Sequence, residues 1–217
     1  FSLSNDKIQF KMDIEFKISK KPVNYKKALI FLEKRVSEVK KGGRELVWFL
    51  EHPTTYTAGI RYNKEEVLDK SINIIKTNRG GKITLHNPGQ KIVYFVLDLN
   101  KRKKNIRNLV RQIESVIINF LKIYRTKAYA DRKNIGIWVN SKKIAAIGIR
   151  VSRWVAYHGF SININNNLYD YKKIMPCGLD NKKVTSLKKE RKKLFKINKN
   201  LKHILFKHIP KIWNFFW

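Results

Sequence analysis

The single cysteine of this chain, Cys177, is the residue best suited to covalent chemistry. It lies between Pro176 and Gly178, a setting typical of a turn, whereas a free cysteine is more often a small buried hydrophobic residue. An accessible thiolate could take up an acyl group as a thioester. The turn by itself leaves both interpretations of Cys177 open. A lone cysteine forms no internal disulfide, which fits a reducing compartment.

A second segment combines a lysine with a run of small and apolar residues. Lys143 is followed by residues 144–148, with the sequence IAAIG, and then by residues 153–160, RWVAYHGF. Small side chains leave room for a ligand chain to lie along a strand, with the lysine at its start. The simpler interpretation is a lysine on an edge strand that extends to solvent.

A third segment, residues 79–90, has the sequence RGGKITLHNPGQ. Gly80 and Gly81 allow backbone to approach a ligand closely. Arg79 supplies a fixed cation beside them, and His86 supplies an imidazole. The structural alternative is a glycine turn between two strands, and an isolated Arg-Gly-Gly is weak evidence for RNA binding.

Together the three segments resemble the lipoyl(octanoyl) transferases of the biotin/lipoate protein ligase superfamily. The resemblance begins in residues 46–59, LVWFLEHPTTYTAG, and runs through Leu187. Three motifs carry it. The first is the glycine loop, with Arg-Gly-Gly at 79–81, Thr84, His86 and Pro-Gly-Gln at 88–90. The second is the lysine strand at 143–148, followed by His158-Gly159, and the third is Pro-Cys-Gly at 176–178 with Val-Thr-Ser-Leu at 184–187. The departures are Thr54, where a second proline is usual, and residues 161–164, SINI, where the family tends to Ala-Leu-Asn-Val.

This resemblance implies the transfer of an octanoyl group from octanoyl-acyl carrier protein to a lysine of a lipoyl domain. The acceptors would be the lipoyl domains of 2-oxoacid dehydrogenases and the glycine-cleavage H-type protein. Cys177 would carry the thioester, and Lys143 would lower the pKa of Cys177 and accept a proton. Backbone amides near Gly178 or Gly81 would hold the oxyanion. No cofactor and no metal is implied.

The resemblance also implies a set of substrate-binding residues that form the walls of the acyl site. His86 is expected to position the ligand and not to act as the base. The set consists of Arg79, Gly80, Gly81, Lys82, Ile83, Thr84, Leu85, His86, Ala146, Ile147, Gly148, Gly159, Phe160 and Ser161.

The formal net charge of +32, from 48 basic and 16 acidic residues, favours acidic partners. Arginine, the side chain that reads bases bidentately, is the minority among the basic residues, which makes nucleic acid an unlikely partner. Three interpretations of the charge remain: compositional drift on a solvated surface, acidic protein partners and nucleic acid.

The hydrophobic periodicity predicts helices over residues 24–40 and 108–124 and strands over 45–51 and 91–99. A hairpin is expected over 135–139 and 143–149, and a half-buried strand over 159–165. This order predicts an α+β fold, a single domain with a mixed or antiparallel sheet flanked by helices, like the biotin/lipoate protein ligases.

We expect residues 1–217 to form one catalytic domain, with a motif-bearing core over about 40–190 and a basic helical tail over about 188–217. The tail is interpreted as a solvated helix that docks on the domain, or as a docking surface for an acidic partner. The longest apolar run has only six residues and no signal peptide pattern is present, so we expect a cytoplasmic protein without a membrane span.

Three other functions are compatible with parts of the sequence. An ATP-dependent lipoate ligase shares the Arg-Gly-Gly loop and the fold but needs no nucleophilic thiol, so Cys177 favours the transferase. A lipoyl-domain amidotransferase, which moves octanoyl between protein lysines, shares the need for Cys177 and Lys143 and stays open. A basic RNA-binding module would explain the charge but none of the three segments.

Overall fold

The computed structural model describes residues 13–175 and 184–192. A seven-stranded sheet forms its centre, in the order β1-β2-β6-β10-β9-β8-β7. Only β1 pairs in parallel, with β2, and the other neighbours are antiparallel. The strands are β1 (Ile14–Ile18), β2 (Glu45–Leu50), β6 (Gln90–Asp98), β7 (Tyr129–Ala130), β8 (Ile137–Val139), β9 (Lys142–Ser152) and β10 (Val155–Asn163).

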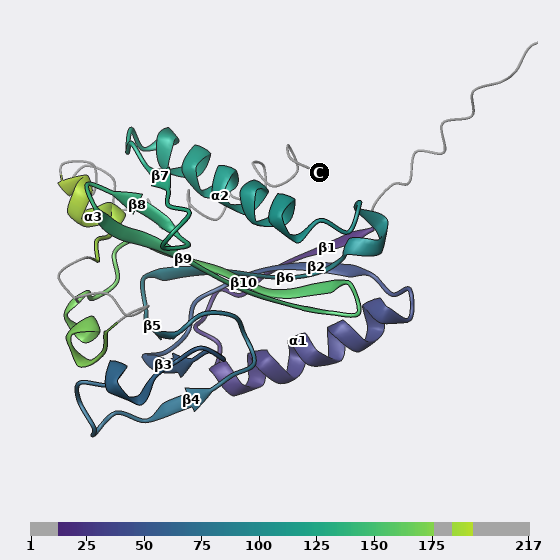
Figure 1. Cartoon of the computed structure of the whole chain (residues 1–217), viewed down its shortest axis with the longest axis horizontal. Coiled ribbons are helices and arrows are strands. Elements are labelled where there is room, and N and C mark those ends of the chain that lie inside the picture. Colours follow the sequence, from purple (N-terminus) through teal and green to yellow (C-terminus); the bar gives the residue numbers. More distant parts are fainter. Residues whose placement is uncertain (1–12, 176–183, 193–217) are drawn as a thin grey trace, which may run out of the picture.

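A smaller sheet of three strands, in the order β4-β3-β5, lies beside the large one (Figure 1). It consists of β3 (Thr55–Ala58), β4 (Ile74–Lys76) and β5 (Ile83–His86). The described helices are α1 (Tyr25–Lys40), α2 (Ile106–Ile123) and α3 (Leu187–Glu190), with short 3-10 turns η1 (Lys64–Glu66), η2 (Leu99–Lys101) and η3 (Tyr169–Lys173). The predicted α+β class with a mixed sheet is therefore confirmed.

Two helices cover opposite faces of the large sheet (Figure 1). One core lies between α2 and the sheet, where Ile117 and Phe120 pack against Phe95. The other lies under α1, where Leu32 packs near Trp48. Both helices were predicted, and each begins where an asparagine side chain caps its first turn: Asn24 accepts from Lys27 N at 3.2 Å, and Asn105 accepts from Asn108 N at 2.9 Å.

The prediction of a half-buried strand over 159–165 is wrong in its exposure and in its bounds. Strand β10 begins at Val155 and is buried along its whole length, including Ser161 and Asn163. The reason is its position in the centre of the sheet, between β6 and β9, with both sheet faces covered. The polar residues that alternate along β10 therefore line an internal site and do not meet solvent.

The predicted hairpin is present as β8 and β9, and it turns at Asn140 and Ser141 with positive φ angles of 47° and 59°. Strand β9 continues past the expected end at Ile149 and turns again at Arg153 and Trp154 to enter β10. This places β9 inside the sheet, so Lys143 is not on an edge strand.

The described residues contain no helix long and apolar enough to cross a membrane. Most of the predicted basic tail, from residue 193 onward, lies outside the described residues, and so does the helical pattern expected there.

Candidate active site

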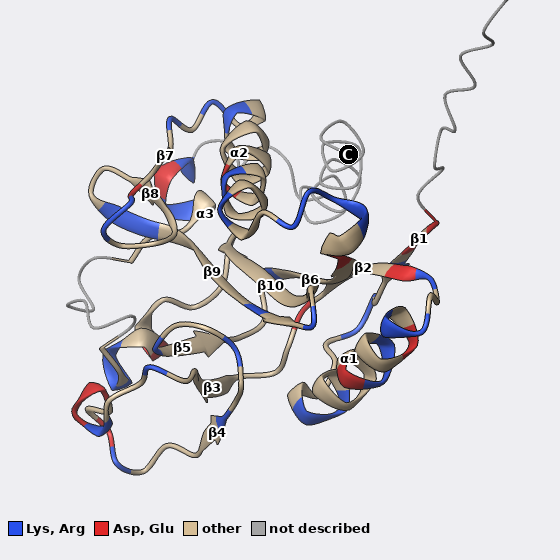
Figure 2. Ribbon diagram, turned by 45° about the vertical axis from the view of Figure 1, so that its right-hand side comes forward, with Lys and Arg blue, Asp and Glu red and all other residues tan. Residues whose placement is uncertain are grey.

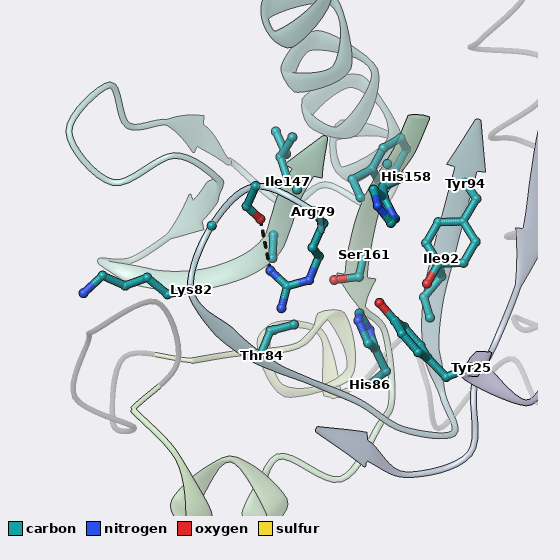
Figure 3. A pocket seen from close by; sticks show the side chains of 16 residues that line it. Tyr25, Arg79, Lys82, Thr84, His86, Ile92, Tyr94, Ile147, His158 and Ser161 are labelled. Carbon is teal, nitrogen blue, oxygen red and sulfur yellow. Dashed lines mark hydrogen bonds between the residues drawn. The ribbon is translucent and has the colours of Figure 1, made fainter. Parts of the chain in front are cut away.

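A cleft opens between the small sheet and the centre of the large sheet, beside the N-terminal end of α1 (Figure 3). It encloses about 490 Å³, part of it open to solvent. Twelve of the fourteen predicted binding residues line it, drawn from the glycine loop, from β9 and from β10. The other two, Ile83 and Leu85, are fully buried and pack into a separate core with Tyr56 and Ile174.

The glycine loop places Arg79 in the wall of this cleft. The guanidinium donates to the carbonyl oxygen of Thr57 at 2.8 Å, to its hydroxyl at 2.9 Å and to the Gly80 carbonyl at 3.1 Å. Arg79 is only 8% exposed. In Figure 3 its guanidinium points into the space between Thr84 and Ser161.

Glycines form the floor of the cleft because the backbones and Arg79 come too close for a side chain. A Cβ at Gly159 would lie 1.9 Å from the Val93 carbonyl oxygen. A Cβ at Gly148, the partner of Gly159 in the sheet, would lie 3.4 Å from Arg79 Cδ. At Gly148 and Gly159 the floor therefore consists of bare backbone, which leaves room for an extended chain.

Lys143 reaches this cleft because β9 is irregular at its beginning. Trp138 pairs with Lys143 and Ile137 pairs with Ala145, which leaves Ile144 without a partner on β8. Such a β-bulge reverses the alternation of side chains. Both Ile144 and Ala145 pack into the α2 core. Lys143 consequently faces the cleft side and lines a small extension of it together with Thr84, Ala146 and Ser161.

The side chain of Lys143 is 6% exposed and lies with its ammonium 5.3 Å from the centre of the Trp138 ring. Gly136 makes room for it, since a Cβ there would lie 2.6 Å from Lys143 Cε. Within residues 13–175 and 184–192 no carboxylate forms an ion pair with this ammonium. Lys143 is thus a buried lysine whose ammonium lies over an aromatic face.

Cys177 lies outside the described residues, as do Pro176 and Gly178. The chain on either side of them is fixed at two points. Met175 N donates to the Glu66 carbonyl oxygen at 2.7 Å. After the gap, Val184 forms a bridge with Lys143, and Thr185 N donates to the Lys143 carbonyl oxygen at 3.0 Å.

A buried polar network connects these fixed points with the cleft. The Gln90 amide nitrogen donates to the Asn163 side-chain oxygen at 2.9 Å, and the Asn163 amide nitrogen donates to the Thr185 carbonyl oxygen at 3.0 Å. His86 Nδ1 lies 2.7 Å from the Gln90 side-chain oxygen, so it carries the proton and donates. These hydrogen bonds fix the positions of His86 on β5, Gln90 on β6 and Asn163 on β10 relative to Thr185.

The cleft wall also contains residues that the sequence did not predict: Tyr25, Ile92 and Tyr94 line it, and His52 lies behind them. His158, which carries part of the family resemblance but was not expected to bind substrate, lines the cleft as well. The Tyr25 ring stacks on His86 at 5.6 Å, and its edge meets His52 at 4.9 Å. Tyr25 belongs to the buried stripe of α1, and that stripe gives no signal that separates a cleft residue from a core residue.

The histidines of this wall are neutral. Burial lowers the pKa of His86 to about 3, with a smaller contribution from His52, and burial lowers the pKa of His52 to about 4. The pKa of His158 is about 3, because of burial and then the Arg79 charge. Neutral His52 donates from Nδ1 to the Val23 carbonyl, so its Nε2 accepts from the Tyr94 hydroxyl at 2.9 Å.

Among the described residues no group of three or more His, Cys, Asp or Glu side chains could hold a metal ion. The cleft formed by the described residues suits an extended apolar chain, because it has a floor with little side-chain relief, the Arg79 guanidinium in its wall and the Lys143 ammonium in its small extension.

Comparisons with known proteins assign this arrangement to a family. The family model described as "Lipoyl protein ligase A/B catalytic domain" matches residues 24–209. An octanoyltransferase from Wolbachia sp. subsp. Brugia malayi (strain TRS) is 43% identical over 202 residues, covering 89% of this chain and 98% of the relative. An octanoyltransferase from Anaplasma phagocytophilum (strain HZ) is 46% identical over 184 residues, covering 82% and 88%.

Solved structures show the same fold at low sequence identity. A lipoate-protein ligase A bound with ATP superposes with a TM-score of 0.72 at 14% identity, covering 94% of this chain and 86% of that one. Protein Ta0514 of T. acidophilum, a putative lipoate protein ligase with bound lipoic acid, gives a TM-score of 0.67 at 17% identity, covering 81% and 77%.

Proposed function

The chain belongs to the lipoyl protein ligase A/B catalytic-domain family and, within it, to the octanoyltransferases, and from this we propose a donor, an acceptor and a covalent mechanism for it. The chain is an enzyme, a transferase that acts in protein lipoylation. The proposed donor is octanoyl-acyl carrier protein, and the proposed acceptors are lysines of lipoyl domains. A thioester on Cys177 carries the octanoyl group between them.

One observation carries this proposal: the bulge in β9 turns Lys143 into the cleft beside Val184 and Thr185, which follow the segment that contains Cys177. A lysine ammonium at this place favours the thiolate of a nearby cysteine, because opposite charges stabilise each other. No carboxylate in the described part of the chain competes for that ammonium.

The first step exchanges one thioester for another. The Cys177 thiolate attacks the carrier thioester carbonyl, a bond from Cys177 sulfur to the acyl carbon forms, and the bond from that carbon to the carrier sulfur breaks. The leaving carrier thiolate takes a proton from the Lys143 ammonium. The products are octanoyl-Cys177, a neutral Lys143 amine and the free carrier thiol.

The second step restores the starting state. The amine of the target lysine attacks the octanoyl-Cys177 carbonyl, the new amide bond forms and the Cys177 thiolate leaves. The attacking amine loses its proton to the Lys143 amine. The thiolate and the ammonium are then ready for another carrier, and no proton is gained or lost by the enzyme over the cycle.

The cleft supports this role by holding the acyl chain away from water. The chain would lie on the floor from Ala146 to Gly148, with Ser161 and Thr84 at the end near Lys143. Gly81, with a φ of 91°, is a candidate for an oxyanion donor from its backbone amide. The other donor candidate, near Gly178, lies outside the described residues.

The charge gives a reason for the choice of partners. Lys and Arg occur on α1, on α2 and in the loops between strands (Figure 2), in a chain of net charge +32. Such a field speeds encounter with acidic proteins and weakens as salt shortens the Debye length.

Raising salt from about 50 mM to about 500 mM should therefore lower kcat/KM for a carrier-bound donor. A short octanoyl thioester without the carrier should respond much less, and equal responses would remove the docking role of the charge.

Intact-mass spectrometry tests the covalent step. After mixing with octanoyl-carrier protein, the enzyme should gain the mass of one octanoyl group, and Cys177→Ser and Cys177→Ala should gain none and transfer none. Transfer by Cys177→Ala would contradict the mechanism. A dependence on ATP with free octanoate would indicate a ligase, and use of an octanoylated lipoyl domain but not of the carrier would indicate an amidotransferase.

A further inference from the structure

Two nitrogen atoms of the cleft wall are buried without a hydrogen-bond partner in the part of the chain that the structure describes. They are Nε of Arg79 and Nδ1 of His158. Arg79 is 8% exposed and His158 is 2% exposed. An unpaired buried polar atom costs free energy and is rare in native proteins, and an alkyl chain in the cleft would give neither atom a partner. The two atoms together therefore indicate that the cleft binds a polar group at this place.

The two atoms have opposite hydrogen-bonding roles. His158 Nε2 lies 2.7 Å from the side-chain oxygen of Asn78, whose amide nitrogen donates to Glu33. Burial, and then the Arg79 charge, lowers the pKa of His158 to about 3, so the neutral ring has one proton. That proton is on Nε2, which donates to Asn78, and Nδ1 is left as an acceptor. Arg79 Nε is always a donor. One hydroxyl group could accept from the arginine and donate to the histidine.

Contacts of the glycine loop bring these two side chains together. Gly80 N donates to the Ile149 carbonyl oxygen at 3.2 Å, and Ile149 is the sheet partner of His158. At Gly148, the residue before Ile149 on β9, the position of a Cβ lies 3.4 Å from Arg79 Cδ, the atom bonded to Nε. Figure 3 shows both side chains on the same side of the cleft. Both atoms thus lie beside one short stretch of β9.

The backbone of β10 is strained where it presents this imidazole. Ala156 and Phe160 pack into the α2 core, so strict alternation along the strand would place His158 there too. Instead His158 has a φ of 67°, in the left-handed region, and its ring stacks on Tyr157 with 4.7 Å between the ring centres. Left-handed backbone at a residue other than glycine is a feature that clusters at functional sites. The fold keeps an imidazole in the cleft in spite of this strain.

We propose that Arg79 Nε and His158 Nδ1 form a hydroxyl-binding subsite, so that the enzyme also transfers medium-chain acyl groups that carry a hydroxyl on the chain. This inference rests on the proposed function, because it takes the thioester carbonyl to lie near Lys143. Ser161 lines both the cleft and the extension that contains Lys143, and His158 is three residues from it along β10, roughly 10 Å. The carrier is joined to the other side of the carbonyl, so the hydroxyl that reaches this subsite belongs to the acyl chain.

The experiment compares carrier-bound octanoyl with carrier-bound hydroxyoctanoyl donors whose hydroxyl is on carbon 5, 6, 7 or 8. A hydroxyl buried without partners should lower kcat/KM about tenfold or more. In the wild type we expect at least one of these isomers to have a kcat/KM within about threefold of octanoyl, because the subsite pairs its hydroxyl. If every isomer fell below that range, the two nitrogen atoms would hold water only and the proposal would be overturned.

His158→Phe removes the acceptor and keeps an aromatic ring. The ratio of kcat/KM for the best hydroxyoctanoyl donor over octanoyl should fall about tenfold, because the hydroxyl loses a hydrogen bond in a buried site. Arg79→Lys keeps the charge but has no nitrogen at the position of Nε, so it should lower the same ratio. An unchanged ratio in His158→Phe, or in Arg79→Lys if the first variant does not fold, would refute the subsite.

His52→Gln is the matched control variant. His52 is also a buried, neutral histidine, but both of its ring nitrogens have partners, the Val23 carbonyl oxygen and the Tyr94 hydroxyl. It should keep the wild-type ratio, and an equal fall in His52→Gln and His158→Phe would assign the effect to a loosened wall and overturn the proposal.

A donor with its hydroxyl on carbon 3, next to the thioester, is the matched control substrate. Its ratio to octanoyl should be the same in the wild type and in His158→Phe, and a tenfold fall there would show that the hydroxyl is not recognised by its place on the chain. Loss of the octanoyl adduct on Cys177 in the wild type would overturn the proposed function. A normal adduct without the expected transfer of hydroxylated chains would overturn only this inference.

Discussion

Two buried basic side chains line the cleft and its extension, and they are held in different ways. The Lys143 ammonium lies over the Trp138 ring. The Arg79 guanidinium donates three hydrogen bonds to backbone and hydroxyl oxygens. An arginine cannot lose its proton in a protein, whereas a lysine can both lose and regain one. Of the two, only Lys143 is therefore suited to the proton transfer that we propose.

The backbone around the two side chains also differs. Lys143 faces the cleft only because Ile144 bulges out of register and because Gly136 lacks a side chain. Arg79 is held by Thr57 on the neighbouring β3, in a sheet that is regular there. The position of Lys143 thus depends on a local irregularity and should be easy to disturb, while the position of Arg79 depends on ordinary pairing.

The largest effect is expected from Lys143→Met, which removes the proposed proton acceptor and the proposed partner of the Cys177 thiolate. We expect kcat/KM for octanoyl transfer to fall about 100- to 1000-fold, as for the loss of a general acid–base group. The pKa of Cys177 should rise, so iodoacetamide labelling near pH 7 should slow about tenfold for each unit of that rise. Labelling rates measured across pH give the shift directly.

Lys142→Met is the control for this prediction, because the neighbouring residue of the strand points to the other face. It should label like the wild type. Lys143→Arg separates the two roles, since it keeps a positive charge but cannot take up a proton. Normal labelling with slow transfer is expected, and labelling of Lys143→Met that matches the wild type at every pH would contradict the ion pair.

A smaller effect is expected from Gly136→Ala. Its φ is 143°, and its new Cβ would lie 2.6 Å from Lys143 Cε and 2.7 Å from the Ala145 carbonyl oxygen. Displacing Lys143 should lower kcat/KM about tenfold, and the overpacking should reduce the free energy of unfolding by roughly 2–3 kcal/mol.

Gly42→Ala is the control variant, because it introduces backbone strain without displacing a neighbouring side chain. Gly42 also has a positive φ, 87°, but a Cβ there would have nothing within 4 Å. It should cost about 1–2 kcal/mol of stability, from conformational strain alone, and leave transfer unchanged. Urea unfolding of both variants, with transfer rates measured on folded protein, separates strain from displacement. Equal transfer in the two variants would show that Gly136 does not position Lys143.

The elements that position the site could be predicted from the sequence because each follows a local rule. Helix α1 shows an apolar face at helical spacing and begins at a capping asparagine, and β6 is a continuous apolar run. The grouping of the glycine loop with the lysine strand came from the family resemblance, and the structure places both on one cleft. The placement of Cys177 stays a prediction, since it lies outside the described residues.

Other features depend on contacts between distant segments, and no local pattern contains them. Alternation on β10 placed Ser161 toward solvent, but α1 and the small sheet cover that face. Strict alternation on β9 would have placed Lys143 on the α2 face with Ile147, and only the pairing with β8 reveals the bulge. Tyr25 looked like any residue of an amphipathic stripe, yet its ring stacks on His86 from a different part of the chain.

The smallest expected effect concerns acid, and it separates the cleft wall from Cys177 by pH. The pKa of His86 and of His158 is about 3, so both stay neutral above about pH 5, and Arg79 stays charged. The ratio of kcat/KM for a decanoyl over an octanoyl donor depends on the cleft wall, so it should be constant between about pH 7.5 and 5, while iodoacetamide labelling of Cys177 should fall as its thiolate is protonated. A ratio that changed over this range would show that a titrating group also shapes the cleft wall.

The free energy of unfolding also depends on these buried histidines, and it should fall as the pH falls. Their pKa in the unfolded chain is about 6.5, so below that pH the unfolded chain binds more protons than the folded one. Each buried histidine should then remove up to about 1.4 kcal/mol of stability per pH unit, until the pH reaches its folded value of about 4 for His52 or about 3 for His86 and His158. In His52→Gln the slope of the free energy of unfolding between about pH 6 and 5 should be smaller by nearly that amount. An unchanged slope would mean that His52 is protonated in the folded protein, and that its Nε2 does not accept from Tyr94.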